Sequence, residues 1–245
     1  MKLSEMYTEI KKCRVCSSDK LNTVLSLGEQ YLTGVFPKSI EDDITKGPLE
    51  LVFCEECTLL QMKHSYSLDE MYGENYGYRS GLNSSMVSHL QQKIHSLEIL
   101  VKPTNEDLVI DIGSNDATSL KAYSGIHRKV GIDPTGLKFK EYYTDDITLI
   151  PDFFSALAFN KLFPNEKARI VTSISMFYDL ENPIDFVADI ESVLANDGIW
   201  HFEQSYMPSM LRTNSYDTIC HEHLEFYSLK VVKDIIVIII HFRII

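Results

Sequence analysis

Four cysteines in two closely spaced pairs carry the most specific chemistry in the sequence. The pairs have the form Cys-x-x-Cys and consist of Cys13 with Cys16 and Cys54 with Cys57. A two-residue spacing lets both thiolates of a pair face one ion, and two pairs complete the closed tetrahedron of a structural zinc site. A redox pair should begin a helix that follows a strand, which neither pair does, and two unrelated pairs are the remaining alternative. The spacing therefore predicts structural zinc.

A loop between a strand-like run and a helix is the second candidate site. It runs from Asp111 to Ala117 and contains Gly113, and open α/β sheets bind ligands at such carboxyl ends of strands. Asp133 ends the next strand-like run, at a spacing that suits an acid accepting hydrogen bonds from ribose hydroxyls. Asn115 and Ala117 stand where a dinucleotide-binding loop has two of its three glycines. The missing glycines disfavour a pyrophosphate-containing dinucleotide more than S-adenosylmethionine, and a plain tight turn is the alternative.

Two residues after the third strand-like run extend this candidate site. Asp152 is followed by Phe153, and an acid with an aromatic neighbour at this position could bind and cover adenine. Phe153 could equally be a core residue. We therefore expect Asp152 and Phe153 to contribute to cofactor binding.

A histidine-rich segment follows the last strand-like run. In an extended chain, His221 and His223 would face one side and Glu222 the other. Histidine suits a general base at neutral pH because its ordinary pKa is about 6.5, and a neighbouring carboxylate can hold its tautomer. The alternatives are a purely structural role and a His-x-His metal half-site completed by Glu203 or Glu225.

Alternating strand-like and helix-like segments from residue 107 onward must position these residues. The expected strands cover residues 108–112, 130–133, 147–150, 169–174 and 198–202, with an amphipathic helix at 183–194. Strands separated by helices of this length build a doubly wound parallel α/β sheet. We therefore expect a zinc-binding domain at 1–62, a tyrosine-rich and helical connector over the active site at 63–105, and an α/β domain at 106–245.

Composition narrows the class of partner. The chain has 245 residues with a net charge of -12 from 23 basic and 35 acidic residues, and such an acidic surface disfavours nucleic acid. The first ten residues contain no apolar signal-peptide core, and no segment reaches the roughly 20 apolar residues that a membrane span needs. We expect a cytoplasmic protein with a small-molecule substrate and a monomeric or weakly dimeric state.

Taken together, the motifs resemble one known family. The chain is similar to the sugar C-methyltransferases that carry an N-terminal zinc-binding domain. The matching segments are Cys13-x-x-Cys16, Leu27–Gln30, Phe53–Cys57, Met71–Tyr78, Val109–Asp116, Gly131–Pro134 and Tyr216–His223. They occur in order along nearly the whole chain, so their combination is far more specific than any single segment.

The resemblance implies a fold, a cofactor and a reaction. It implies a Rossmann-like class I methyltransferase sheet that binds S-adenosylmethionine and methylates a keto-deoxysugar attached to a nucleotide. A base removes the proton beside the keto group, and the resulting enolate carbon attacks the methyl group. The implied catalytic residues are Tyr76, Tyr78, Tyr216, His221, Glu222 and His223, with His223 as the base. The cofactor-binding candidates are Asp111, Gly113, Asn115, Asp133, Asp152 and Phe153.

The chain departs from the family pattern at three places. Many members have tyrosine where Cys220 stands, and several carry a histidine after the fourth strand, where this chain has the segment Met176–Leu180. These differences leave the sugar open, and with it the choice between C- and O-methylation. Members of the family also continue further, whereas here a helix beginning near Ser228 is expected to dissolve into the isoleucine-rich tail 235–245. We therefore expect a sheet that is incomplete at its C-terminus, with an inactive remnant or a zinc-module scaffold as alternatives.

Overall fold

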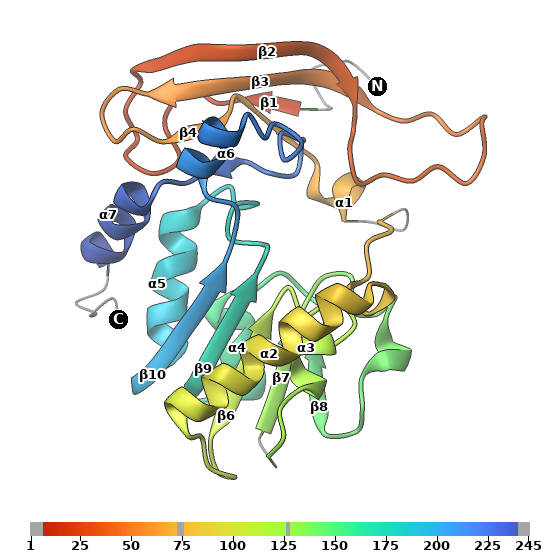
Figure 1. The fold of residues 1–245 in the computed structure, drawn as a ribbon, viewed down its shortest axis with the longest axis vertical. Coiled ribbons are helices and arrows are strands. Elements are labelled where there is room, and N and C mark those ends of the chain that lie inside the picture. Colours follow the sequence, from red (N-terminus) through yellow and green to blue (C-terminus); the bar gives the residue numbers. More distant parts are fainter. Residues whose placement is uncertain (1–6, 73–75, 126–127, 240–245) are drawn as a thin grey trace. The chain divides into compact units, whose positions relative to one another are not determined.

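The chain divides into two compact units (Figure 1). The computed structural model describes residues 7–72, 76–125 and 128–239. The cysteine unit comprises residues 1–77, 177–188 and 204–245, and the sheet unit comprises residues 78–176 and 189–203. This division differs from the three consecutive segments expected from the sequence, because two later stretches of the chain return to the cysteine unit.

The sheet unit is built on five parallel strands in the order β10-β9-β6-β7-β8. Their bounds are β6 (Leu108–Ile112), β7 (Arg128–Ile132), β8 (Ile147–Ile150), β9 (Ala168–Ile174) and β10 (Leu194–Glu203). From β6 the chain proceeds through β7 to β8 on one side, and later returns to the other side as β9 and β10. The carboxyl ends of β6 and β9 therefore flank the point of reversal, where open α/β sheets bind ligands. The expected parallel α/β sheet is confirmed.

Helix α2 (Ser84–Val101) supplies much of the core of this unit. Its buried residues Leu90, Ile94, Leu97 and Val101 recur at helical spacing, and three of them pack in one cluster with β6, β9 and α3 (Thr118–Lys121). The side chain of Asn83 caps the helix by accepting hydrogen bonds from the next backbone amides. In Figure 1, α2 crosses in front of the strands and α4 lies behind them.

The remaining helices have at most 11 residues. They are α1 (Leu68–Met71), η2 (Ser80–Leu82), η3 (Lys140–Tyr142), α4 (Ala156–Leu162), α5 (Pro183–Val193) and α6 (Met207–Thr213).

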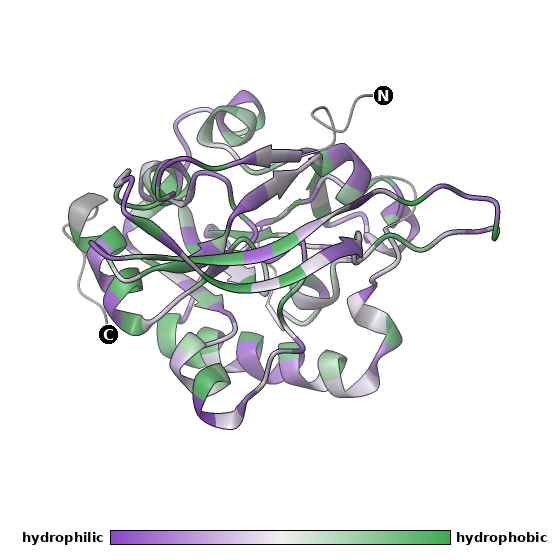
Figure 2. Ribbon diagram, turned by 90° about the horizontal axis from the view of Figure 1, so that it is seen from above, coloured by the Kyte–Doolittle hydropathy of each residue, from purple (hydrophilic) through white to green (hydrophobic). Residues whose placement is uncertain are grey.

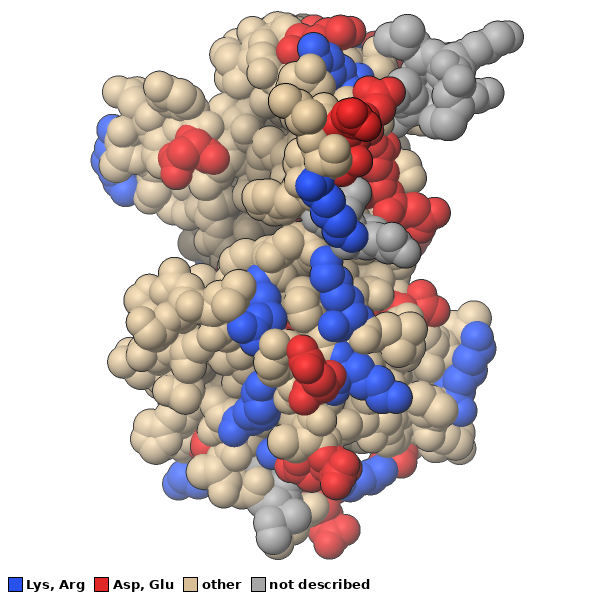
Figure 3. All heavy atoms as spheres, turned by 90° about the vertical axis from the view of Figure 1, so that its right-hand side faces the viewer, with Lys and Arg blue, Asp and Glu red and all other residues tan. Residues whose placement is uncertain are grey.

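Among the described residues, none of the helices combines the length and the hydropathy that a bilayer-spanning segment requires. On the face drawn in Figure 3, basic and acidic side chains are interspersed.

The cysteine unit is an antiparallel sheet that recruits a strand from late in the chain. Its strand order is β11-β4-β3-β2, and a small ladder joins β1 to β5. The bounds are β1 (Tyr7–Glu9), β2 (Leu21–Tyr31), β3 (Lys46–Cys54), β4 (Leu60–Met62), β5 (His64–Tyr66) and β11 (Glu225–Phe226). The long strands β2 and β3 carry both hydrophobic and hydrophilic residues along their lengths (Figure 2). Leu224 and Phe226 are fully buried with Leu49, Leu51 and Met62, so the late segment completes the core of this sheet.

Helix α7 (Leu229–Ile239) corrects an expectation from the sequence. We expected the helix to dissolve at Ile235, but it continues for about one further turn. Val231, Val232, Ile235 and Ile236 are buried while Val237 is 70% exposed, so the helix has one buried face. The helical periodicity cannot be seen in the sequence, because buried and exposed positions are both occupied by β-branched apolar residues. Residues 240–245 of the expected tail lie outside the described residues.

Candidate functional site

The two cysteine pairs lie in turns of the same design. The carbonyl group of Cys13 accepts a hydrogen bond from Ser17, and that of Cys54 accepts one from Thr58. Ser17 and Thr58 have positive φ angles of 59° and 69°, so each turn folds back just after the second cysteine. The backbone amide of each first cysteine is also bonded within its turn. Each turn thus presents its two sulfur atoms on one side.

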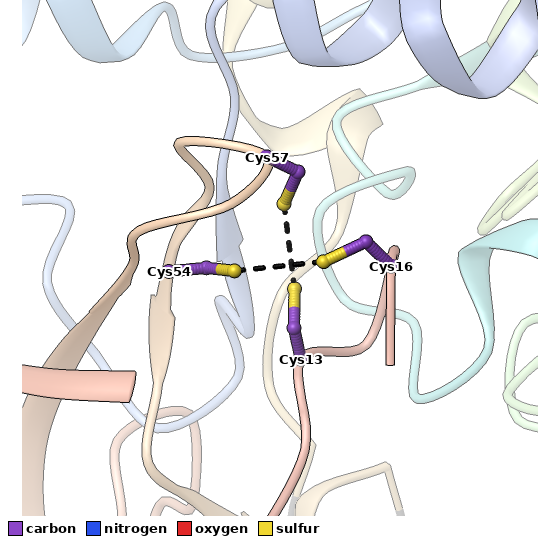
Figure 4. Close-up of side chains that lie close together, drawn as sticks. All are labelled: Cys13, Cys16, Cys54 and Cys57. Carbon is purple, nitrogen blue, oxygen red and sulfur yellow. Dashed lines mark hydrogen bonds between the residues drawn. The ribbon is translucent and has the colours of Figure 1, made fainter. Parts of the chain in front are cut away.

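The four sulfur atoms converge on one point (Figure 4). All lie within 4.8 Å of one another, and the Sγ atoms of Cys13 and Cys57, like those of Cys16 and Cys54, are 3.5 Å apart. A zinc ion with Zn–S bonds of about 2.3 Å places tetrahedral sulfurs about 3.8 Å apart, so the cluster fits zinc. The hydrogen bond from the Cys57 thiol lowers the pKa of Cys13 to about 4 and favours the thiolate that a metal binds. Within the described residues, no other group of three ligating side chains comes together.

The loop after β6 is fixed by two residues from neighbouring elements. Gly113, Asn115 and Ala117 have positive φ angles of 70°, 48° and 59°, which is a strained arrangement for the two non-glycine residues. The amide of Asn115 donates to Asp133 Oδ2 at 2.7 Å, and the hydroxyl group of Tyr143 donates to the carbonyl of Asn115 at 2.9 Å. Asp133 thus ties the loop after β6 to the loop after β7.

The two candidate acids at the strand ends have different surroundings. The second carboxyl oxygen of Asp133 accepts two hydrogen bonds from Thr135, both at 2.6 Å. Asp111 is buried within the sheet and accepts a hydrogen bond from Thr172 Oγ1 at 2.5 Å. Burial raises the pKa of Asp111 to about 7, with a smaller contribution from the negative charge of Asp133. Asp111 therefore links β6 to β9, while Asp133 organises the loop.

The side chains of the loop hold the beginning of the sheet unit. Asn115 Oδ1 accepts from the amide of Ser80 at 2.9 Å, and Asp116 Oδ2 accepts from the amide of Gly81 at 3.0 Å. Asn115 Nδ2 also donates to the carbonyl of Tyr78 at 3.2 Å, while the Tyr78 side chain is 48% exposed. Sequence reasoning missed Asp116, because a buried aspartate between two loop residues gives no spacing signal.

Met176 and two residues after β8 are the remaining side chains of interest at this end of the sheet. Met176 lies beside the loop after β6, since a Cβ atom added to Gly113 would lie 3.3 Å from Met176 Cγ. Asp152 and Phe153 follow β8 and are exposed, and Asp152 Oδ1 accepts a hydrogen bond from the amide of Phe153 at 2.8 Å. Both of these side chains are therefore accessible at the carboxyl end of the sheet.

The histidine-rich segment forms a turn, which corrects the extended conformation expected from the sequence. The amide of His223 donates to the carbonyl of Cys220, so the chain reverses at these residues. His221 is fully buried, with its ring 4.8 Å from that of Tyr66, and burial lowers its pKa. The two histidines thus have different surroundings, because the turn breaks the alternation of sides.

His223 is held in one tautomer. Its Nδ1 atom lies 2.7 Å from the carbonyl oxygen of Thr218, which can only accept, so Nδ1 carries the proton and Nε2 has the free lone pair. Its ring lies 4.3 Å from the ring of Tyr178. Burial lowers the pKa of His223, so the imidazole is neutral near pH 7. This state is the one that a general base requires.

Glu222 and its neighbours come from three distant segments. The hydroxyl of Thr33 donates to the Glu222 carboxylate, and Gly34, with a φ of 76°, leaves no space for a Cβ atom beside that carboxylate. Asp179 accepts a hydrogen bond from Tyr72, and its pKa is raised well above the usual range by burial. Sequence reasoning missed Thr33, Tyr72 and Asp179, since only the fold brings these segments together.

The other candidate tyrosines are less enclosed. Tyr76 forms an isolated antiparallel bridge with Val35, and its ring lies 5.5 Å from that of Tyr72. Tyr216 is 74% exposed.

The candidate site residues are distributed over both units. The cysteine unit contains Tyr76, Tyr216, His221, Glu222 and His223, and the sheet unit contains Tyr78, Asp111, Gly113, Asn115, Asp133, Asp152 and Phe153.

Two sequence comparisons find similar proteins. Residues 13–72 match the Methyltransf_13 family model, described as a putative zinc binding domain. Over 232 residues the chain is 28% identical to the C-methyltransferase NovU of Streptomyces niveus. The resemblance to zinc-domain C-methyltransferases is confirmed. The match covers 93% of this chain and 55% of NovU, so the chain spans about half the length of this relative.

Solved structures show partial similarity. One is a chain of the complex between the Haloferax volcanii Trm112 methyltransferase activator and a putative methyltransferase, with a TM-score of 0.46 and 16% identity over 62% of this chain and 70% of that one. Another is the plantazolicin methyltransferase BamL, with a TM-score of 0.48 and 13% identity over 64% of this chain and 63% of that one.

Proposed function

We propose that the chain belongs to an S-adenosylmethionine-dependent methyltransferase that acts on a nucleotide-linked keto-deoxysugar and forms a carbon–carbon bond. The observation that carries the proposal is the state of His223. Its Nδ1–H group is bonded to the Thr218 carbonyl, and burial lowers its pKa, so Nε2 can accept a proton at neutral pH. The similarity to NovU, which is named a C-methyltransferase, supports the type of reaction.

The proposed reaction proceeds in two steps. His223 Nε2 takes the proton from the carbon beside the keto group, and the electron pair of the C–H bond becomes that of an enolate. When bound, S-adenosylmethionine would supply an electrophilic methyl group to the enolate carbon, and the electron pair of the broken sulfur–methyl bond would remain on sulfur. The nearby Glu222 carboxylate favours the imidazolium that the first step produces.

The loop after β6 is the proposed site for the methyl donor. It contains Gly113 and is positioned by Asp133, at the carboxyl ends of strands where such sheets bind ligands. Asp152 and Phe153 are exposed after β8 and are the proposed contacts for adenine. S-Adenosylmethionine supplies the electrophilic methyl group, and this chain's residues supply binding, orientation and the base.

Zinc has a structural role in this proposal. All four ligands are cysteine sulfurs, so the coordination is closed and leaves no position for a substrate. The turn at Cys54–Cys57 joins β3 to β4, and β11, which follows the histidine turn, pairs with β4.

Calorimetry and product analysis test the proposal. Titration with S-adenosylmethionine should give a saturable signal that S-adenosylhomocysteine competes away. Incubation with a nucleotide-linked 4-keto-6-deoxysugar should then give a product whose new methyl resonance couples to ring carbon. A methyl group on oxygen would replace the C-methylation proposal with O-methylation, and the absence of donor binding would reject the methyltransferase proposal.

A further inference from the structure

Arg14, inside the first cysteine pair, is buried and held by several hydrogen bonds. Its side chain is 3% exposed. The guanidinium donates to the carbonyl of Met62 at 2.6 Å and to Ser65 Oγ at 2.8 Å, and the Arg14 amide donates to Gln61 Oε1 at 3.1 Å. These contacts fix the side chain against β4 and β5. Arginine is suited to such a site because its planar fork donates in several fixed directions.

The same guanidinium faces two carboxylates from later parts of the chain. Its Nε atom is 3.7 Å from Glu225 Oε1 and 3.4 Å from Glu181 Oε2. Glu225 is fully buried, and the backbone of Leu180 contributes a hydrogen bond to its carboxyl group. Burial raises the pKa of Glu225 well above its usual range, and the positive charge of Arg14 opposes that rise. Arg14 is therefore the counter-charge that the structure places beside Glu225.

Glu225 begins β11 two residues after His223, so its position constrains the histidine turn. Glu225 pairs with Gln61 of β4, the residue whose side chain accepts from the Arg14 amide. The amides of Leu224 and Glu225 both donate to the carbonyl of Tyr178, at 2.8 and 3.0 Å. The ring of Tyr178 in turn lies 4.3 Å from the ring of His223. A shift of Glu225 would therefore move both the turn and the ring that lies beside His223.

We propose that Arg14 is a positioning residue for His223: by pairing with Glu225 it fixes β11, and with it the histidine turn, to the sheet that carries the cysteine cluster. This inference rests on the proposed role of His223 as a base. The segment between the first two cysteines then has a role besides metal binding, because Arg14 fixes the position of the histidine turn. Zinc binding and the geometry of the base are then coupled through one side chain.

Three variants test the inference, compared with the full chain loaded with zinc. Arg14→Met removes the charge and keeps much of the volume, and Arg14→Lys keeps the charge. The matched control is Lys20→Met, since Lys20 pairs with Glu56 of the other cysteine pair but is 60% exposed. We measure zinc per chain, S-adenosylhomocysteine affinity, the NMR titration of His223, and the rate of solvent-deuterium exchange beside the keto group of the sugar.

We expect Arg14→Met to keep one zinc per chain and an unchanged donor affinity. Its His223 titration should shift toward the ordinary value, and the exchange rate should fall by a factor on the order of 100. Arg14→Lys should recover at least a tenth of the wild-type rate, and Lys20→Met should match the wild type. An unchanged His223 titration and exchange rate in Arg14→Met would overturn the inference, as would loss of zinc with the His223 titration intact.

A double variant covers the case in which Arg14→Met fails to fold. Adding Glu225→Gln removes the buried carboxyl group that has lost its counter-charge and should restore folding and zinc binding, but not the wild-type His223 titration. A wild-type titration in this double variant would refute the role of the ion pair. Because the NMR titration needs no turnover, it also separates this inference from the proposed function, which fails instead if the wild-type chain binds no methyl donor.

Discussion

Gly131 provides a direct test of how tightly the loop after β6 is packed. A Cβ atom at this position in β7 would lie 2.7 Å from Ser114 Oγ, 2.9 Å from Tyr143 Cε1 and 3.1 Å from Leu120 Cδ1. Overpacking of this kind costs about 1–3 kcal/mol, whereas replacing a strand glycine by alanine returns about 0.5–1 kcal/mol. We therefore expect Gly131→Ala to lower the free energy of unfolding by about 1–2 kcal/mol.

The same substitution should weaken donor binding, because the residues it displaces hold the loop. The hydroxyl of Tyr143 bonds to the carbonyl of Asn115 and lies 2.8 Å from Ser114 Oγ. If about half of the strain is relieved by movement of the loop, the affinity for S-adenosylhomocysteine should fall about twofold to fivefold. Calorimetric titration measures this loss, and thermal unfolding should show a Tm lower by roughly 2–8 °C.

A double-mutant cycle separates the specific clash from general damage. Ser114→Ala removes the oxygen atom nearest to the added methyl group. Combined with Gly131→Ala it should recover about 0.5–1 kcal/mol relative to the sum of the single changes. A stable Gly131→Ala variant with wild-type affinity, or strictly additive effects in the cycle, would refute this explanation of the loop.

Three further predictions concern the loop, the histidines and the metal. Tyr143→Phe should cost about 1 kcal/mol and less than threefold in donor affinity, since it removes one hydrogen bond and adds no clash; thermal unfolding and calorimetry check both values. Burial lowers the pKa of His221 and His223, so the unfolded chain binds more protons below about pH 6.5. The free energy of unfolding should therefore keep its full value above that pH and decline as the pH falls through the lowered pKa values of the two histidines. The acid limb of the kcat/KM profile should lie below pH 6.5. A free energy of unfolding that is the same at pH 7 and pH 5 would contradict this. Removing zinc with a chelator should lower the free energy of unfolding of the cysteine unit by on the order of 5 kcal/mol, with readdition restoring it, as followed by circular dichroism and metal analysis.

The parts of the structure that follow local patterns could be predicted from the sequence. The strand at 108–112 and the strand at 147–150 agree with β6 and β8, because short apolar runs bounded by glycine or proline specify buried strands. The cysteine cluster could also be predicted from the sequence, since two Cys-x-x-Cys pairs leave few other arrangements. In each case the signal lies within a few consecutive residues.

The parts that depend on distant segments could not be predicted in the same way. β11 is only two residues long, and nothing local indicates that it joins β4, some 160 residues earlier. Asp179, Thr33 and Arg14 likewise acquire their partners only when the chain folds back on itself. The alternation of sides expected for an extended chain does not apply at Cys220–His223, because a backbone hydrogen bond reverses the chain there.

In the proposed reaction, His223 Nε2 removes the proton beside the keto group of the sugar. Deuterium exchange at that carbon, followed by NMR in heavy water, measures this step without methyl transfer. We expect exchange by the wild-type chain and a loss of about a thousandfold or more in His223→Ala, with donor affinity unchanged. Exchange at the wild-type rate in His223→Ala would contradict the role of His223 as the base.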